Sequence, residues 1–165
     1  MWRHILLKMK TASLQEIKQE LQHLNLKEVQ ELCLRLARFK KDNKELLGYL
    51  LFQAHNEESY VQGIKEELDE LFAEINTSHV YFAKKSLRKI LRVAGKHTKY
   101  SCNKQTEVEV LLHFCTKLKA SGLAKEKNAV IHKLYLTQLK KVQKLVAALH
   151  EDLQYDYIKA IETLG

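Results

Sequence analysis

The chain has 165 residues, of which 45% are hydrophobic and 29% charged, so it has enough apolar side chains for a folded core and differs in composition from a disordered polypeptide. It contains no proline and five glycines, so turn-forming residues are scarce and an all-β or α/β fold is disfavoured. The formal net charge of +8 makes it a basic protein and directs attention to anionic partners.

The first two helices are predicted from capping boxes, in which a polar residue and a glutamate three positions later cap a helix start. Residues 1–12 precede them as a loosely attached segment without the apolar core of a signal peptide. Ser13 and Glu16 begin a helix that ends near Asn25. Asn25 and Glu28 begin a second helix, and Asp42 with Glu45 begins a third. The second helix carries one apolar face, formed by Val29, Leu32, Cys33, Leu36 and Phe39.

The segment from Leu46 to Ala54 is the most apolar, with seven of nine positions hydrophobic. Such a segment is predicted to be the central element of the fold, surrounded by other helices. Its apolar stripe stays in phase as far as Ile75, which allows one long helix over 43–76. The polar residues 55–58 allow a break instead, and both alternatives stay open.

Three further elements are predicted after this region. Thr77 and Ser78 are candidate caps of a helix that runs to about Lys99. A turn over 101–103 leads into a helix from Lys104 to about Ala120, which residues 121–122 end. From near Asn128, an apolar stripe continues to Leu164 and predicts a long C-terminal helix over 128–164, with a possible kink at 150–152. Gly48 and Gly63 lie inside helical patterns and predict close contacts between helices.

The predicted fold class is all-α, a single domain over 1–165 with six to eight amphipathic helices. Residues 34–52 resemble residues 91–114 in their order of apolar and polar positions. Two similar helix hairpins would suit a short α-solenoid, and this pattern loosely resembles HEAT or armadillo repeats. Long continuous apolar stripes favour a helical bundle instead. The sequence leaves both architectures open.

The positive charge is concentrated in one region of the chain. Between Lys84 and Lys144 there are sixteen Lys and Arg and three acidic residues, a net of +13. At 100° per residue, the helix over 79–99 gathers its cations opposite an apolar side, so a basic ridge facing solvent is expected. The residues predicted to be buried on that apolar side are Val80, Ala83, Leu87, Ile90 and Ala94. The C-terminal helix repeats this arrangement more weakly, and its residues predicted to face inward are Ile131, Tyr135, Val142 and Val146. The predicted anion-binding residues are Lys84, Lys85, Arg88, Lys89, Arg92, Lys96, Lys99, Lys104, Lys133, Lys140 and Lys144.

The charge pattern predicts a non-enzymatic interaction module whose partner is nucleic-acid backbone or an acidic protein. Binding to nucleic acid would be independent of base sequence, because few aromatic residues interrupt the ridge. The acidic residues between Glu57 and Glu74 could instead pair with the ridge, either inside the fold or across a homo-oligomer. A self-associating structural or adaptor protein is therefore the main alternative, and an enzyme is the third.

No motif predicts a catalytic residue, a metal ligand or a cofactor. Glu20 and His23 form a single Glu-x-x-His, whereas a di-metal site in a helical bundle needs two. His97 and His113 lie near cysteines but without a glycine-rich turn for an oxyanion. Cys33, Cys102 and Cys115 are predicted to be reduced core thiols of a cytoplasmic protein. No apolar run has the roughly 20 residues that span a bilayer.

Overall fold

The computed structural model describes residues 11–165, and over this range the chain forms eight α-helices and no strand. They are α1 (Leu14–Leu21), α2 (Leu26–Phe39), α3 (Lys41–Phe52), α4 (Glu57–Ala73), α5 (Val80–Ser101), α6 (Lys104–Ala120), α7 (Ala129–Val146) and α8 (Glu151–Glu162). The predicted all-α class with six to eight helices is confirmed. Most of the predicted N-terminal segment 1–12 lies outside the described residues. None of the eight helices combines the length and apolarity that a bilayer crossing requires.

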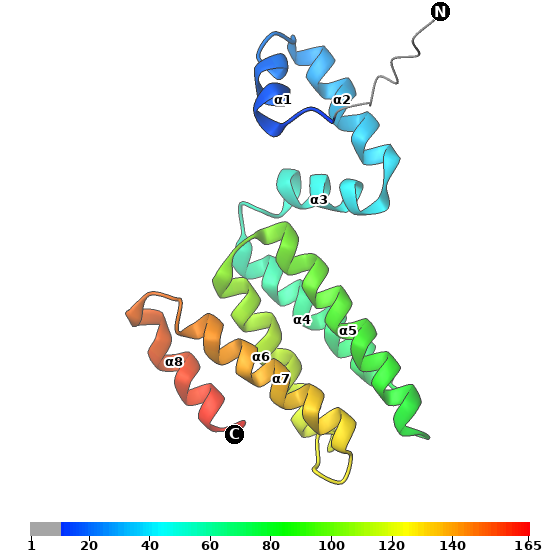
Figure 1. The fold of residues 1–165 in the computed structure, drawn as a ribbon, viewed down its shortest axis with the longest axis vertical. Coiled ribbons are helices and arrows are strands. Elements are labelled where there is room, and N and C mark those ends of the chain that lie inside the picture. Colours follow the sequence, from blue (N-terminus) through cyan, green and yellow to red (C-terminus); the bar gives the residue numbers. More distant parts are fainter. Residues whose placement is uncertain (1–10) are drawn as a thin grey trace, which may run out of the picture. The chain divides into compact units, whose positions relative to one another are not determined.

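The chain divides into two compact units, Met1–Leu47 and Gly48–Gly165, and the division falls within α3. Figure 1 shows α1 and α2 in the first unit and α4 to α8 in the second. The prediction that residues 1–165 form one domain stays a prediction, because this division does not test whether either unit folds alone.

In the first unit, the first two predicted capping boxes are formed, whereas the predicted start of the third helix at Asp42 is wrong, because α3 already begins at Lys41. The Ser13 N–H donates to Glu16 Oε2 at 2.7 Å, and the Glu16 N–H donates to Ser13 Oγ at 3.3 Å. Asn25 and Glu28 repeat the arrangement at 2.8 and 3.0 Å. Although both helices are strongly amphipathic, neither α1 nor α2 contains a buried residue. Their apolar faces are thus formed as predicted but remain largely uncovered.

The expectation that 46–54 is the central element is wrong. Within α3 only Tyr49 is buried, whereas Leu50, Leu51 and Phe52 are 56%, 61% and 73% exposed. A helix that is apolar on all sides can be buried on all sides, but only if other helices surround it. The sequence of the helix does not show whether they do. The internal similarity with 91–114 therefore relates a largely exposed segment to one that supplies much of the core.

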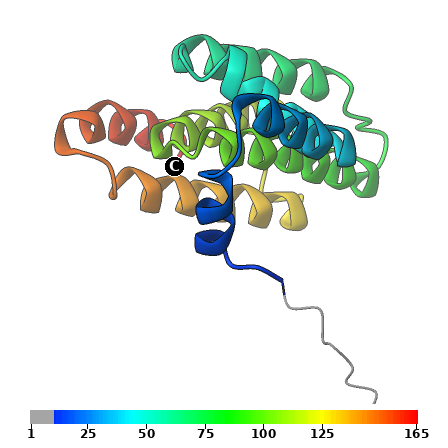
Figure 2. The same ribbon diagram turned by 90° about the horizontal axis from the view of Figure 1, so that it is seen from above.

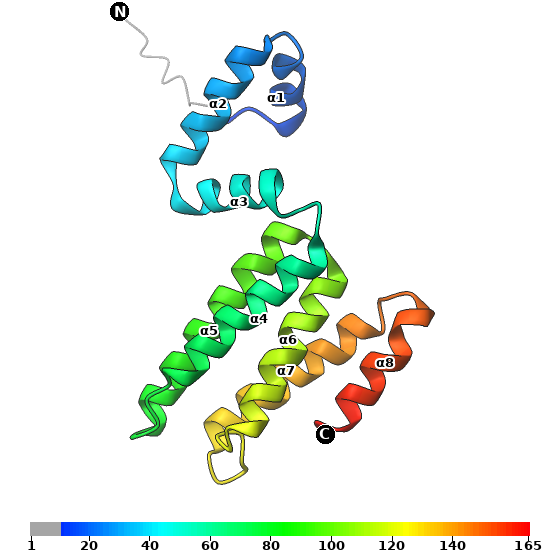
Figure 3. The same ribbon diagram turned by 180° about the vertical axis from the view of Figure 1, so that it is seen from behind.

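In the second unit each helix packs antiparallel against the next from α4 to α7, and α8 turns back along α7 (Figures 1 and 3). In addition, α4 packs on α6 and α5 on α7. Figure 2 shows α4 and α7 on opposite sides of α5 and α6. This order is common to bundles and short solenoids, so the two predicted architectures both remain compatible with the contacts.

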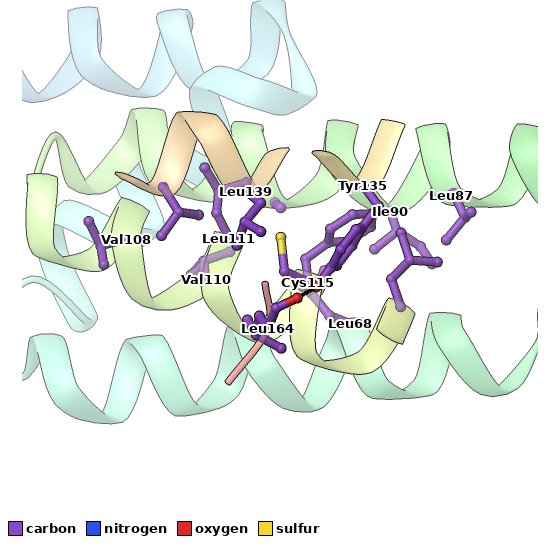
Figure 4. Close-up of a cluster of buried hydrophobic side chains, with 14 of the residues drawn as sticks. Leu68, Leu87, Ile90, Val108, Val110, Leu111, Cys115, Tyr135, Leu139 and Leu164 are labelled. Carbon is purple, nitrogen blue, oxygen red and sulfur yellow. Dashed lines mark hydrogen bonds between the residues drawn. The ribbon is translucent and has the colours of Figure 1, made fainter. Parts of the chain in front are cut away.

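The core of the second unit lies around α6, which contacts α4, α5 and α7. Its buried residues occupy several sides of the helix, as expected for an element with neighbours all round. They are Thr106, Val108, Val110, Leu111, Phe114, Cys115 and Leu118. Figure 4 shows Leu68 of α4, Ile90 of α5 and Tyr135 of α7 converging on Cys115. Tyr135 Oη also donates to the backbone oxygen of Leu164 at 2.5 Å, which ties the end of the chain to this core.

Two helix breaks divide stripes that are continuous in the sequence. Residues 53–56 separate α3 from α4, and Asn56 Oδ1 caps α4 by accepting from the Ser59 N–H at 3.1 Å. Of the two alternatives for 43–76, the break is therefore correct. The long helix over 128–164 is wrong, because α7 ends at Val146 and α8 begins at Glu151. A turn of suitable length keeps the helical phase, so periodicity alone does not reveal it.

The remaining boundaries need smaller corrections. His79, rather than Thr77 or Ser78, caps α5, because its Nδ1 accepts from the Tyr81 N–H at 3.1 Å. The helix over 104–120 and its end at Ser121 are confirmed. The expected close contacts at Gly48 and Gly63 are absent, since a Cβ at either would meet no described atom within 4 Å.

Candidate anion-binding surface

The helix α5 separates apolar and cationic residues by its periodicity. Ala83, Leu87, Ile90 and Ala94 recur at intervals of three and four residues, and each is at most 1% exposed. Burial of this stripe turns the opposite side of the helix to solvent. Val80 was expected on the buried side, but at the first position of α5 it is 42% exposed. The buried stripe thus begins one turn into the helix.

Most of the predicted ridge residues on α5 face solvent. Lys85, Arg88, Lys89, Arg92 and Lys99 are exposed, whereas Lys84 and Lys96 are half-buried. We define the five exposed cations as the basic ridge. The helix contains no acidic residue. Among residues 11–165, no carboxylate forms an ion pair with any of these five side chains.

The acidic residues of α4 differ in direction, and Asp69 is bonded to α6. Asp69 lies 2.6 Å from His113 Nε2 and 2.9 Å from Lys117 Nζ. Partial burial opposes ionisation of Asp69, but hydrogen bonds from Lys117 and His113 outweigh it and lower the pKa of this carboxyl. Toward α5, Glu67 pairs with His97 at 2.9 Å, and His97 is not a member of the basic ridge. Among residues 11–165, no carboxylate of α4 forms an ion pair with the five cations of the basic ridge, and pairing of the acidic helix with the ridge across a homo-oligomer stays a prediction.

The predicted cations on α7 also lie on its outer side. Ile131, Tyr135, Val142 and Val146 are buried as expected. The row of exposed cations on α7 comprises Lys133, Lys140 and Lys144. Lys141, beside them, is paired with Glu107 at 2.6 Å. Because α5 and α7 pack against each other, the two rows lie on neighbouring helices.

Lys104 is exposed and opens α6, directly after the turn that ends α5. That turn is held by Cys102, which adopts a left-handed conformation with φ 53° and donates its N–H to Thr98 O at 3.0 Å. Asn103 Oδ1 then caps α6 by accepting from the Gln105 N–H at 2.9 Å. The turn thus places Lys104 beyond the C-terminal end of the basic ridge.

A second group of cations, which the sequence prediction omitted, lies at the turn between α6 and α7. These cations, Lys119, Lys125 and Lys127, border an open hollow of about 700 Å³ together with Glu126 and His132. Lys119 Nζ donates to the backbone oxygen of Thr163 at 2.9 Å, and His132 Nδ1 lies 2.7 Å from Ala124 O. His132 therefore fastens the turn, whereas Lys119 ties the end of α6 to the end of α8. The Lys-Glu-Lys sequence at 125–127 was the available signal, but it carries no information on where its loop folds.

A polar cleft of about 460 Å³ lies between α4, α6 and α8, where an enzyme would need converging titratable groups. Its central carboxylate, Glu109, is bonded to Lys65 Nζ at 2.8 Å and accepts from Tyr157 Oη at 3.2 Å. Gln105 donates to the same Tyr157 oxygen at 3.1 Å. Burial raises the pKa of Tyr157, so this phenol keeps its proton. These groups bond to one another and tie α8 to the rest of the unit.

Tyr60, His97 and Glu67 form a hydrogen-bonded row that joins α4 to α5. The Tyr60 oxygen lies 2.9 Å from His97 Nδ1, and His97 Nε2 lies 2.9 Å from Glu67 Oε2. Burial raises the pKa of Tyr60, so its hydroxyl remains a donor to Nδ1 and leaves Nε2–H to donate to Glu67. His97 thus has both ring nitrogens occupied.

The cysteines differ from the prediction of three core thiols. Cys115 is fully buried, whereas Cys33 and Cys102 are exposed, and all three are free. Burial raises the pKa of the Cys115 thiol to about 12, which keeps it from acting as a thiolate. Glu20 and His23 are both exposed on or beside α1. Over residues 11–165, no three metal-binding side chains are grouped closely enough to hold an ion.

No protein-family model, curated protein or solved structure matches this chain significantly.

Proposed function

We propose that the chain is a non-enzymatic interaction module that binds the phosphate backbone of nucleic acid through the basic ridge of α5. The proposal rests on one observation, that no carboxylate among the described residues pairs with the cations of the basic ridge. Five exposed cations occupy one side of a helix without acidic residues, while the carboxylates of the neighbouring α4 bond elsewhere or remain on its own surface. Such a charged surface attracts polyanions, and each phosphate contact releases bound counterions.

The composition of the ridge favours nucleic acid over an acidic protein as the partner. Protein interfaces are depleted in lysine and rely on aromatic or apolar anchors at their centre. Three of the five ridge residues are lysines, and the exposed rings of Tyr81 and Phe82 lie beside its N-terminal end. A row of flexible cations with exposed aromatic rings only at one end suits phosphate groups, whose contacts position a backbone but do not read its sequence.

The dimensions of the ridge suit a short stretch of backbone. From Lys85 to Lys99 the helix extends about 21 Å at 1.5 Å per residue. That length corresponds to about six base-pair steps at 3.4 Å per step along one strand. Lys104 and the row of α7 cations would extend the same field. Affinity should consequently depend on charge and salt, with little dependence on base sequence.

Charge reversal tests this function directly. In the triple variant Lys85→Glu, Lys89→Glu, Arg92→Glu, affinity for a labelled DNA duplex, measured by fluorescence anisotropy at low salt, should fall at least about tenfold. The matched control reverses Lys18, Lys27 and Lys44, which are also exposed and change the net charge equally. Equal losses of affinity in both variants would show that only the net charge matters, and would overturn the proposed site. Binding to polyglutamate but not to duplex would assign the ridge to an acidic protein instead.

A further inference from the structure

The first unit presents an apolar helix face without a cover, which is unusual for a helix of such clear amphipathicity. In α2, Leu32, Leu36 and Phe39 are 40%, 60% and 76% exposed, and Val29 is only half-buried. These four positions follow the alternating three- and four-residue spacing of the a and d positions in a coiled coil. We call Val29, Leu32, Leu36 and Phe39 the α2 seam.

From this seam and the charges beside it, we infer that the chain binds a second copy of itself through α2, antiparallel across a two-fold axis. The inference is separate from the proposed nucleic-acid function, because it concerns the first unit and uses no residue of the basic ridge. The order of charges along α2 favours a second copy of the chain as the partner that covers the α2 seam.

The charge order favours an antiparallel pair. In the N-terminal half of α2 the acidic residues Glu28 and Glu31 outnumber Lys27, whereas the charged residues of its C-terminal half, Arg35 and Arg38, are both basic. A parallel pair would place like charges at the same level, which is destabilising, whereas an antiparallel pair places acids opposite arginines. The opposed helix dipoles favour the same orientation.

One register aligns all four seam positions and brings Glu28 within reach of Arg35 of the second copy, while the two copies of Arg35 also lie near the two-fold axis. If Leu32 packs level with Leu36 of the second copy, Val29 packs level with the second Phe39, giving four apolar layers. In coiled-coil geometry the residues before each a position then adjoin across the interface, so Glu28 lies beside Arg35 of the second copy. Arg35 has no ion-pair partner among the described residues.

The same register brings the two copies of Cys33 together near the two-fold axis. Cys33 follows the d position Leu32 and lies on the opposite flank of the seam from Arg35. Its side chain is exposed and free in the single chain. The paired cysteines would be neighbours across the interface at a separation that a short two-headed thiol reagent can bridge. Cross-linking of Cys33 to its copy can therefore test the proposed register.

Cross-linking of the full chain with a short bismaleimide tests the register. Cys102→Ser, which leaves Cys33 as the exposed thiol, should give a covalent dimer, and Cys33→Ser, which leaves Cys102, should give little. Equal yields from the two variants, or no dimer from either, would overturn the inference.

Sedimentation equilibrium over a range of protein concentrations tests the interface itself. The average mass of the wild type should rise with concentration, and Leu36→Asp should abolish the rise. Leu34→Asp is the matched control, because Leu34 is 50% exposed but lies on the opposite side of α2 from the seam. Far-ultraviolet circular dichroism verifies that both variants keep their helix content. A wild type that stays monomeric at all concentrations, or equal effects of both substitutions, would overturn the inference.

Discussion

Thr106 of α6 donates a hydrogen bond from Oγ1 to Glu57 Oε1 of α4 at 2.5 Å, although 49 residues separate them in the chain. Thr106 is 2% exposed, and Ser101 donates to the same carboxylate oxygen. Tyr49 donates to the other oxygen at 2.8 Å. Glu57 therefore fastens the turn between α5 and α6 to the start of α4. This turn sets the angle between α6 and α5, the helix that carries the basic ridge.

Removing the Thr106 hydroxyl should destabilise the protein. In Thr106→Val the buried site loses one donor to a carboxylate, which costs about 1 to 3 kcal/mol of unfolding free energy. Thr106→Ser keeps the donor and should lose less. Thr137→Val is a matched control, because Thr137 is exposed and bonds only to Lys133 O of its own helix, at 2.8 Å. Urea titrations measure the difference, and equal losses for Thr106→Val and Thr137→Val would contradict this account.

Stability should fall in acid through Glu57 and Asp69. Burial raises the pKa of Glu57, but hydrogen bonds from Ser101, Thr106 and Tyr49 together bring it below the ordinary value of 4.5. A depressed folded-state pKa contributes stability above the unfolded value, and this contribution is lost as pH falls through the folded value. The wild type should therefore lose unfolding free energy below about pH 4.5 more steeply than Glu57→Gln. Parallel pH profiles for the two proteins would refute the assignment.

Two glycine substitutions should have opposite effects. Gly63 lies inside α4, where an added Cβ would meet nothing within 4 Å, so Gly63→Ala should stabilise the protein by about 0.5 to 1 kcal/mol. Gly122 follows α6 with φ +71°, a left-handed conformation that costs an L-residue about 1 to 2 kcal/mol. Gly122→Ala should therefore lower the melting temperature while Gly63→Ala raises it. A shift of the same sign in both variants would contradict the described backbone.

The three thiols should react in two classes. Cys33 and Cys102 are exposed and should react with a chromogenic disulfide reagent in the native state. Cys115 is buried, and its pKa of about 12 suppresses the thiolate, so it should react only after unfolding in denaturant. Counting released chromophore before and after denaturation checks this. Rapid native-state reaction of a Cys33→Ser, Cys102→Ser double variant would show that Cys115 is accessible.

Local signals in the sequence were sufficient for much of the secondary structure. Ser13 with Glu16 and Asn25 with Glu28 are interactions within four residues, so the sequence contains both partners of each cap. The buried stripe of α5 could also be predicted, because helical geometry alone relates Leu87 to the opposite cations.

Contacts between helices could not be predicted in the same way. Nothing near Glu57 in the sequence identifies Thr106 as its partner, and Lys65 likewise reaches Glu109 from 44 residues away. Such pairs depend on which helices adjoin and at what register. The central position of α6 and the exposure of α3 depend on the same information, which periodicity lacks.

The salt dependence of nucleic-acid binding tests the central claim most directly. If the basic ridge binds phosphates, the logarithm of the association constant for a DNA duplex should fall linearly with the logarithm of salt concentration, with a slope of about −3 to −5 for four or five contacts. Scrambling the base sequence should leave both affinity and slope nearly unchanged. In the Lys85→Glu, Lys89→Glu, Arg92→Glu variant the slope should decrease by about 3 in magnitude. No binding at low salt, or a slope unaffected by these substitutions, would contradict the account.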